Sequence, residues 1–353
     1  AIYLTSLLPS VLPGDSGEFQ LAPYVLGVPH PTGYPLWVLL GNLMSRLPIG
    51  SVAYRLNLLS ALSGALAVLG LYAAARALGA RPTVSLLTAL AFAVTPTMWE
   101  QSVRAEKYAL NVAFVALTLW LLLQWRQSRR TRWLNLFAFA YGLSLTHHRT
   151  MALMAPAYAL FIILEDRAVL RVRRLLTLAA LFVLPLGLYL ALPILSGRHP
   201  PVNFLQPNTA RQFFDLILAS TYQGNFLLQG WGAVWPQLQQ LGGNLLRQFT
   251  WPGLLLALGG IIALTRRDRN AALLLALAVV LQVGFSLNYS VPNNYVYYLP
   301  TFALTALVIA AGMEAVMRWP AGLGRKLQTV AGTALMMVLS LLPFHLWARG
   351  SGA

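Results

Sequence analysis

Apolar residues form long runs along the chain, and short segments rich in Arg, Pro and Gly separate these runs. A run of about 20 apolar residues has the length that a helix needs to cross a bilayer. The pattern predicts an all-α polytopic integral membrane protein with about 11 transmembrane helices. We expect these helices near 1–12, 52–78, 84–98, 107–125, 133–146, 150–164, 174–195, 251–265, 271–288, 296–317 and 327–347.

The composition agrees with a membrane domain. Of 353 residues, 58% are hydrophobic and 10% are charged, whereas a water-soluble domain carries about 25% charged residues. The chain has too little polar surface to cover itself in water, so we expect residues 1–353 to form a single transmembrane domain. The residues before Pro13 are too few to span a bilayer unaided, and we expect the first helix to begin before Ala1.

The net charge of +16 would suit a nucleic-acid-binding protein, but the basic residues lie in short loops and match no nucleic-acid motif. We therefore expect no nucleic-acid partner. The absence of Cys excludes disulfides and thiolate metal sites. The ratio of 23 Arg to 2 Lys indicates a GC-rich prokaryotic genome.

The distribution of basic residues predicts the orientation. One set of loops holds 16 of the 25 Lys and Arg residues, close to helix ends, and by the positive-inside rule these loops are cytoplasmic membrane anchors. Residues 13–50 and 196–250 then lie outside. The outer segments also hold all five His residues and five of the nine acids, which are Asp15, Glu18, Glu100, Glu106 and Asp215.

The first outer motif is Gly14-Asp15-Ser16-Gly17-Glu18-Phe19. The spacing of Asp15 and Glu18 is that of a helix capping box. The same carboxylate could instead act as a general base, since sugar transfer to an alcohol needs a group that accepts the hydroxyl proton. Burial beside apolar groups is expected to raise the pKa of Asp15 and strengthen it as a base.

The second motif, Val28–Pro35, contains three Pro and one Gly and predicts a rigid loop that presents His30 and Tyr34. Residues 36–47 follow as an interfacial amphipathic helix. The third motif spans 99–108. If it is helical, Glu100, Arg104 and Lys107 share one face, and a solvated salt-bridge turn is the alternative.

The fourth motif is His147-His148-Arg149. Adjacent His residues point in different directions on a helix and a third ligand is missing, so we expect no metal. The Arg149 guanidinium suits the phosphate of a polyprenyl phosphate or pyrophosphate. Residues 196–250 are expected to contain interfacial helices, and the tyrosines of 289–298 fit either an aromatic belt or a sugar site.

These motifs resemble the protein O-mannosyltransferase-like membrane family of the GT-C glycosyltransferase superfamily, long catalogued only as a domain of unknown function. The matching stretches are GDSGEF at 14–19, GVPHPTGYPL at 27–36, SVAYRLNLLSAL at 51–62, WEQSVRAEKYALN at 99–111, GLSLTHHRTM at 142–151 and VYYLP at 296–300. The resemblance implies a GT-C-like bundle with outer-face interfacial helices and an acidic base in the first outer loop.

The resemblance implies roles for particular residues. It makes Asp15 the base and places around the donor Glu18, His30, Glu106, Tyr108, His148 and Arg149. The chain departs from the family pattern in two ways. Asn293 and Asn294 stand near a position where an Asp is expected, and the chain stops after its last span, whereas many relatives continue into a soluble repeat domain.

The resulting hypothesis is an inverting glycosyltransferase without cofactor or metal. It moves a sugar, with mannose favoured, from a polyprenyl-phosphate donor to a hydroxyl of a protein or glycan, at the outer face of a prokaryotic plasma (inner) membrane. Asp15 is the base, and Arg149, with Arg104, Lys107 and His148, binds the lipid phosphate. A lipid-linked-sugar or solute transporter and a non-catalytic lipid-phosphate-binding scaffold remain alternatives, although few charges lie at helix midpoints.

Overall fold

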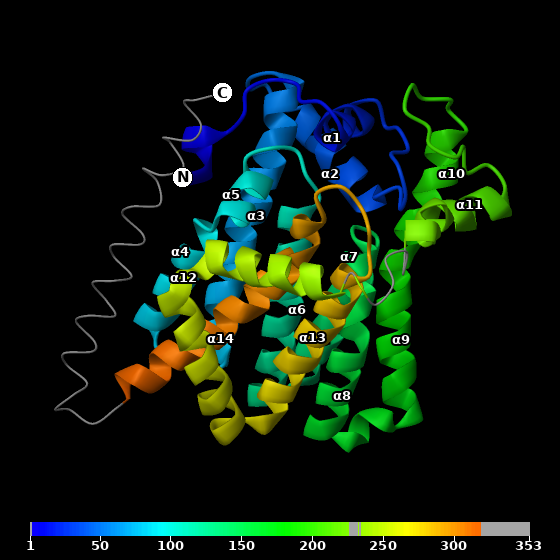
Figure 1. The fold of residues 1–353 in the computed structure, drawn as a ribbon. Helices are drawn as coiled ribbons and strands as arrows, with labels where there is room; N and C mark the ends of the chain where they lie inside the picture. Colours follow the sequence, from blue (N-terminus) through cyan, green and yellow to red (C-terminus); the bar gives the residue numbers. More distant parts are fainter. Residues whose placement is uncertain (1, 226–231, 233, 319–353) are drawn as a thin grey trace.

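The computed structural model of the chain describes residues 2–225, 232 and 234–318, and it is a bundle of helices (Figure 1). The α-helices are α1 (Asp15–Tyr24), α2 (Pro35–Ser45), α3 (Val52–Ala77), α4 (Pro82–Ala93), α5 (Pro96–Ser102), α6 (Tyr108–Ser128), α7 (Thr131–Leu145), α8 (Ala155–Glu165), α9 (Val172–Leu186), α10 (Ala191–Ser196), α11 (Ala210–Ile217), α12 (Val234–Arg267), α13 (Arg269–Leu287) and α14 (Leu299–Met317). Short 3-10 helices are η1 (Ile2–Ser6), η2 (Arg149–Met154), η3 (Arg167–Leu170), η4 (Gly187–Leu190), η5 (Ser220–Asn225) and η7 (Asn294–Tyr298).

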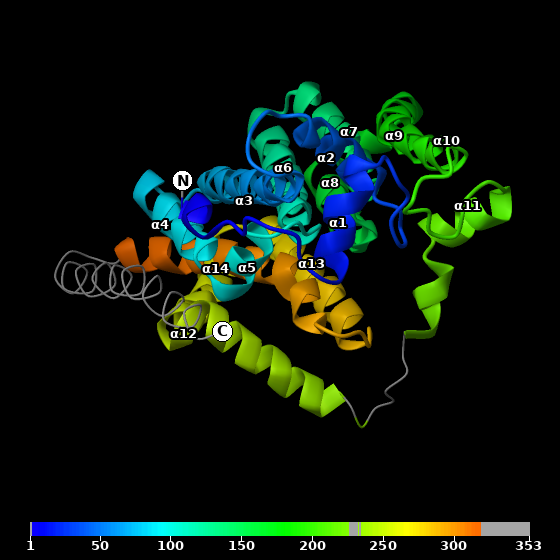
Figure 2. The same ribbon diagram turned by 90° about the horizontal axis from the view of Figure 1, so that it is seen from above.

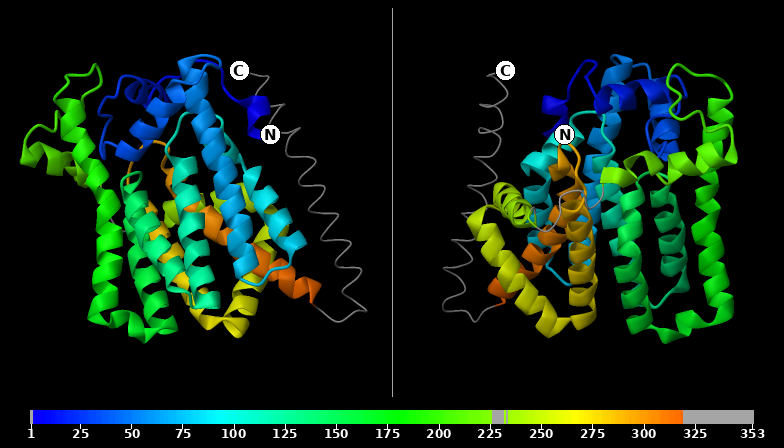
Figure 3. Two further views of the ribbon diagram at one scale, coloured as in Figure 1. Left: turned by 180° about the vertical axis from the view of Figure 1, so that it is seen from behind. Right: turned by 45° about the vertical axis from the view of Figure 1, so that its right-hand side comes forward.

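The predicted helical membrane protein is confirmed. Within the described residues, six helices are long and apolar enough to cross a membrane, and a bent pair, α4 with α5, raises that number to seven. The predicted helices at 133–146 and 150–164 exist as α7 and α8, which have 15 and 11 residues. The predicted helix at 327–347 lies outside the described residues. Figure 3 shows the long helices side by side from two further directions.

Two predicted helices are wrong in form. The sequence predicts a helix over 1–12, but among the described residues only the short η1 forms, and the chain has no regular secondary structure from Leu7 to Pro13, where Pro9 and Pro13 cannot continue a helix. The predicted helix at 84–98 is broken into α4 and α5, which are bent by 69°. Thr95 is extended because Pro96 follows it, and a residue before proline avoids the helical region.

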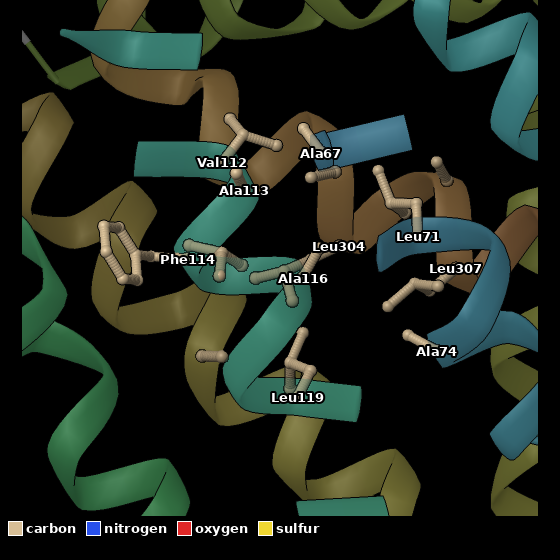
Figure 4. Close-up of a cluster of buried hydrophobic side chains, with 14 of the residues drawn as sticks. Ala67, Leu71, Ala74, Val112, Ala113, Phe114, Ala116, Leu119, Leu304 and Leu307 are labelled. Carbon is tan, nitrogen blue, oxygen red and sulfur yellow. The ribbon is translucent and has the colours of Figure 1, made fainter. Parts of the chain in front are cut away.

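The core lies where α3, α6 and α14 pack together (Figure 4). Ala67 and Leu71 of α3 and Leu304 of α14 are almost fully buried against α6, which carries small residues such as Ala116 at this contact. Small side chains allow membrane helices to approach closely, which favours van der Waals packing where lipid offers no hydrophobic drive. This contact fixes the N-terminal end of α6, next to which the residues of the third motif lie.

One end of the bundle carries the basic loops, and we call it the basic end; the opposite end, with α1, α2 and α11, is the loop end (Figure 1). The loops of the basic end do more than anchor, because their arginines bridge helices. Arg126 of α6 lies 2.6 Å from Asp268 before α13. Glu314 of α14 binds Arg81 at 3.2 Å and Arg318 at 2.8 Å. These ion pairs join α6 to α13 and α4 to α14.

The helix α12 contains two predicted elements. Thr250 has non-helical backbone angles, φ 57° and ψ 174°, and separates an amphipathic half from the predicted span at 251–265. The first half runs across one side of the bundle (Figures 1 and 2), as expected of an interfacial helix. The expected helix over 36–47 is present as α2.

Candidate functional site

The helix α1 begins at the first motif, but the capping-box interpretation is wrong. Gly14 is the N-cap residue, with φ 67°, and no side chain caps the helix. Asp15 is instead the first helical residue, and its carboxylate accepts a hydrogen bond from Lys107 at 2.9 Å. Glu18 accepts the backbone N–H of His30 at 2.8 Å. Both carboxylates therefore bind residues of other outer loops.

The preceding segment, residues 8–12, holds α1 in place. The Gln20 side chain accepts the backbone N–H of Leu12 at 3.2 Å and donates to Asn57 of α3 at 2.9 Å. Asn57 donates in turn to the carbonyl of Leu8 at 2.7 Å. Gly17 lies against this segment so closely that a Cβ at position 17 would be 2.3 Å from the Leu12 carbonyl oxygen. Only glycine fits there.

Lys107 is the buried cation of the site. Its side chain is 2% exposed, whereas that of Asp15 is 58% exposed. The ammonium also lies 4.6 Å from the centre of the Phe19 ring and 5.0 Å from that of Tyr108. Burial acts to lower the pKa of Lys107, but the oxygens of Tyr34 and the carboxylates nearby outweigh burial and raise it. Lys107 is therefore charged.

The expected rise in the pKa of Asp15 is wrong. Partial burial acts to raise this pKa, but the ammonium of Lys107, with smaller contributions from His30 and Arg104, lowers it below its ordinary value. The sequence suggested the apolar surroundings and gave no sign that Lys107, 92 residues away, would pair with this carboxylate. Asp15 is thus ionised and held by a cation in this state of the protein.

The two ends of the third motif make different contacts. Glu100 of α5 forms an ion pair with Arg104 at 2.9 Å, as the salt-bridge interpretation predicted. The chain then leaves the helix, and Glu106 and Lys107 turn inward, so the expected shared face of Glu100, Arg104 and Lys107 does not form. Buried Glu106 accepts a hydrogen bond from Ser16 at 2.8 Å and ties α1 to this loop.

The second motif places His30 beside both carboxylates of α1. Its Nδ1 bonds Glu18, and its Nε2 lies 3.9 Å from Asp15. Phe19 packs edge-to-face with His30 and Tyr34, with ring centroids 5.3 and 5.1 Å apart. The rigid loop thus stacks its two aromatic side chains against α1.

The fourth motif contributes two neutral histidines and a cation. Burial lowers the pKa of His147 to about 4 and lowers that of His148 well below its ordinary value. The Nε2 of His147 donates to the carbonyl of Lys107 at 2.7 Å, which fixes that residue's backbone. Arg149 donates to the carbonyl of Leu218, at 2.6 Å, and so contacts the long outer loop.

These segments surround a cavity of about 420 Å³ at the loop end. Nine of the ten residues predicted from the sequence line it: Asp15, His30, Tyr34, Arg104, Glu106, Lys107, Tyr108, His148 and Arg149. Glu18 does not line it and instead orients His30. Tyr222 of η5 and Tyr289, Asn293 and Tyr297 near the start of α14 complete the wall.

The long outer loop is tied to the second motif. Val28 donates its N–H to the carbonyl of Val202, and Phe204 donates to the carbonyl of Val28, both at 2.8 Å. Leu192 and Leu216 pack on Val28 and Val38 in a small apolar cluster. The loop over 196–225 therefore lies beside the cavity rather than apart from it.

One group in the site has the residue types of a metal centre. Asp15, Glu18 and His30 offer ligand atoms within 4.8 Å of one another. However, Asp15 bonds the Lys107 ammonium, whose positive charge opposes a cation at this place. The donor set therefore fits a divalent ion poorly while Lys107 stays charged.

Comparison with known proteins finds a similar family. Residues 15–170 match the model of a protein family described as the N-terminal domain of the protein O-mannosyl-transferase TMEM260. The predicted resemblance is confirmed. The mouse protein O-mannosyl-transferase TMEM260 is 37% identical over 205 residues, which cover 56% of this chain and 29% of the mouse protein.

A second TMEM260 relative, from Dictyostelium discoideum, is 27% identical over 286 residues, covering 74% of this chain and 35% of that protein. The chain spans about a third of the length of these curated relatives. The fold is similar to that of ArnT from Cupriavidus metallidurans, whose crystal structure was solved bound to undecaprenyl phosphate. The TM-score is 0.64 at 17% identity, over 97% of this chain and 62% of ArnT. The predicted GT-C-like architecture is confirmed as a fold.

Some residues of this site were missed in the sequence. Ser16 joins Glu106, and Ser60 of α3 donates to the Glu106 carbonyl and accepts its N–H at 3.0 Å. His147 stood next to a predicted residue, yet its bond to Lys107 spans 40 residues. Nothing in the local spacing could reveal these contacts, since each joins segments distant in the chain.

Proposed function

We propose that this protein is a membrane mannosyltransferase of the GT-C type. It transfers a sugar, with mannose favoured, from a polyprenyl-phosphate donor to a hydroxyl group of an acceptor, with inversion at the anomeric carbon. The names of the TMEM260 relatives and the undecaprenyl phosphate bound to ArnT support a mannosyl donor on a lipid carrier. The acceptor class follows from the relatives' names, which favour a protein hydroxyl.

The observation that carries the proposal is the arrangement of charge in the cavity. An exposed, ionised Asp15 faces a wall that holds three cations, Arg104, Lys107 and Arg149. A base and preorganised positive charge are the two groups that transfer from a phosphate leaving group requires. Tyr34, Tyr108 and Tyr297 supply ring faces and hydroxyls of the kind that sugars contact.

The proposed reaction assigns each group a step. The acceptor oxygen attacks the anomeric carbon and loses its proton to Asp15, while the bond from that carbon to the phosphate oxygen breaks and its electron pair leaves with the lipid phosphate. Lys107, Arg104 and Arg149 stabilise this leaving charge. Binding of the donor phosphate draws Lys107 from Asp15, and Asp15 then becomes a stronger base.

The proposal also includes a location. The loop end has fewer basic loops than the basic end, so the cavity lies on the extracytoplasmic face by the positive-inside rule. The Arg-rich composition supports a prokaryotic plasma (inner) membrane, while the named TMEM260 relatives are eukaryotic. The reaction is proposed to need no metal, because Lys107 supplies the positive charge beside Asp15.

The test is transfer from polyprenyl-phosphate mannose in detergent, with glucose and arabinose donors alongside. Asp15→Asn should reduce turnover by about 10²–10⁴-fold, the usual contribution of a general base. The matched control is Asp215→Asn, which neutralises another outer carboxylate that pairs with Arg211 and Ser220 and does not itself line the cavity. Turnover should persist in the control.

The outcome also separates the rival functions. Equal turnover in Asp15→Asn and Asp215→Asn would refute Asp15 as the base. Counterflow of labelled lipid-linked sugar in proteoliposomes, without a covalent product, would instead identify a transporter. Donor binding without turnover or transport, and without any dependence on Asp15, would identify a scaffold.

A further inference from the structure

A second cavity lies at the basic end, far from the candidate site. It has a volume of about 290 Å³ and opens between the N-terminal turns of α7 and α9. Its lining consists of Thr131, Leu134 and Asn135 from α7, and Arg171, Arg173, Arg174, Thr177 and Leu178 from the start of α9. The proposed reaction uses none of these residues.

The cavity has an apolar floor and a polar rim. Leu134 is buried and Leu178 packs against the main core. Further along, α7 and α9 approach so closely that a Cβ on Gly142 would lie 2.0 Å from the carbonyl oxygen of Phe182. The two helices are thus fixed against each other there, and the cavity occupies the wedge toward their first turns.

Two of the three rim arginines have no carboxylate partner among the described residues. Asp166 binds the third, Arg174, while Glu165 and Asp268 bind Arg126 and Arg129, and Glu314 binds Arg81 and Arg318. Arg171 and Arg173 are exposed, and neither has an acid within ion-pair distance in this described part of the chain.

The N-terminal ends of α7 and α9 add to the positive electrostatic potential of the rim. Neither α7 nor α9 has a side-chain cap at its N-terminus. The first N–H groups of a helix have no partner within the helix and carry the positive end of its dipole. Two such ends meet at one cavity, together with the hydroxyl groups of Thr131 and Thr177 and the amide of Asn135.

We propose that this cavity binds the phosphate headgroup of an anionic phospholipid from the leaflet at the basic end. The positive-inside rule accounts for arginines at this end, but not for two unpaired arginines above an apolar-floored cavity between helix N-termini. Basic pockets between transmembrane helices on this side suit anionic headgroups. Only 11% of the most apolar part of the stretch Val172–Ser196, which begins with α9, is buried, so the acyl chains have an open lipid-facing helix beside the headgroup.

The test uses the purified full chain in detergent and measures phosphatidylglycerol binding by native mass spectrometry and by thermal unfolding. The double variant Arg171→Gln/Arg173→Gln should bind phosphatidylglycerol about 30-fold more weakly, since it loses two basic contacts. The control, Arg167→Gln/Arg266→Gln, removes the same charge from exposed positions of the basic end that do not line the cavity. It should bind as the original protein does.

A second variant keeps every arginine. Thr177→Trp fills the cavity and should also lose the phosphatidylglycerol effect, while phosphatidylcholine should stabilise all variants equally. Equal weakening in the two double variants would overturn the proposal, because binding would then follow diffuse charge. Full stabilisation by inorganic phosphate alone would also overturn it, since the site would then bind a free anion. Mannosyl transfer is measured separately and does not enter either outcome.

Discussion

Substitution of Gly17 by Ala tests whether the position of α1 controls the proposed reaction. A Cβ at residue 17 would lie 2.3 Å from the carbonyl oxygen of Leu12, whereas real Cβ contacts stay beyond 3.0 Å, so the two must separate by at least about 0.7 Å. The carbonyls of Leu8 and Pro9 accept hydrogen bonds from Asn57 and Ser51 at the start of α3. These bonds resist movement of the segment, so the first turn of α1 must shift and carry Asp15 with it.

The magnitude follows from this displacement. Misplacing a reacting group by about 1 Å can reduce a rate about 100-fold, so a shift of the Asp15 carboxylate by most of that distance should reduce kcat about 10- to 100-fold. The fold should persist, because Ala stabilises a helix by about 1 kcal/mol relative to Gly and this gain offsets part of the strain. Donor binding should change less than kcat, since Arg104 and Arg149 belong to other segments.

The assay compares kcat from polyprenyl-phosphate mannose and thermal unfolding for Gly17→Ala and Gly284→Ala. Gly284 is also a helical glycine, in α13, and a Cβ there would meet nothing within 4 Å. Gly284→Ala should therefore keep its turnover. Equal kcat values for the two variants would refute the proposed link between the Leu12 contact and the position of Asp15.

Three further predictions concern charge and metal. In Lys107→Met, the group that most lowers the pKa of Asp15 is lost, so this pKa rises and the acid limb of the kcat/KM profile moves to higher pH; an unchanged limb would contradict the ion-pair account. Chelation with EDTA should leave turnover unchanged, and loss of activity restored by a divalent ion would overturn the metal-independent mechanism. Glu314→Ala should lower the free energy of unfolding by about 1–3 kcal/mol, because the charged hydrogen bonds to Arg81 and Arg318 are lost. Thermal unfolding of Glu314→Ala measures that effect, with Glu100→Ala, which removes a more exposed carboxylate, as the comparison.

The sequence predicted the elements whose causes are local. Apolar runs of membrane length gave α3, α6, α13 and α14 close to their observed bounds, because hydropathy acts through each residue's own side chain. It also predicted nine of the residues that line the cavity. These residues could be found because the chain has few charges and many of its polar groups lie in the outer loops.

What the sequence missed depends on contacts between distant segments. The form of residues 8–12 depends on Asn57 and Gln20, which replace the hydrogen bonds of a helix. The pKa of Asp15 depends on Lys107, and the position of Lys107 depends on His147. Spacing within a motif carries no information on such pairs.

The formal charges of the cavity wall have a consequence for the choice of donor. Arg104 is paired with Glu100 behind the wall and Lys107 lies beside Asp15 and Glu106, so Arg149 is the cation of the wall that has no carboxylate partner among the described residues. A sugar on a lipid monophosphate carries a single negative charge, which Arg149 can balance. A pyrophosphate-linked sugar would leave excess negative charge beside Asp15, and so would the dianionic lipid phosphate after transfer. The charge balance thus favours monophosphate donors and promotes release of the spent carrier.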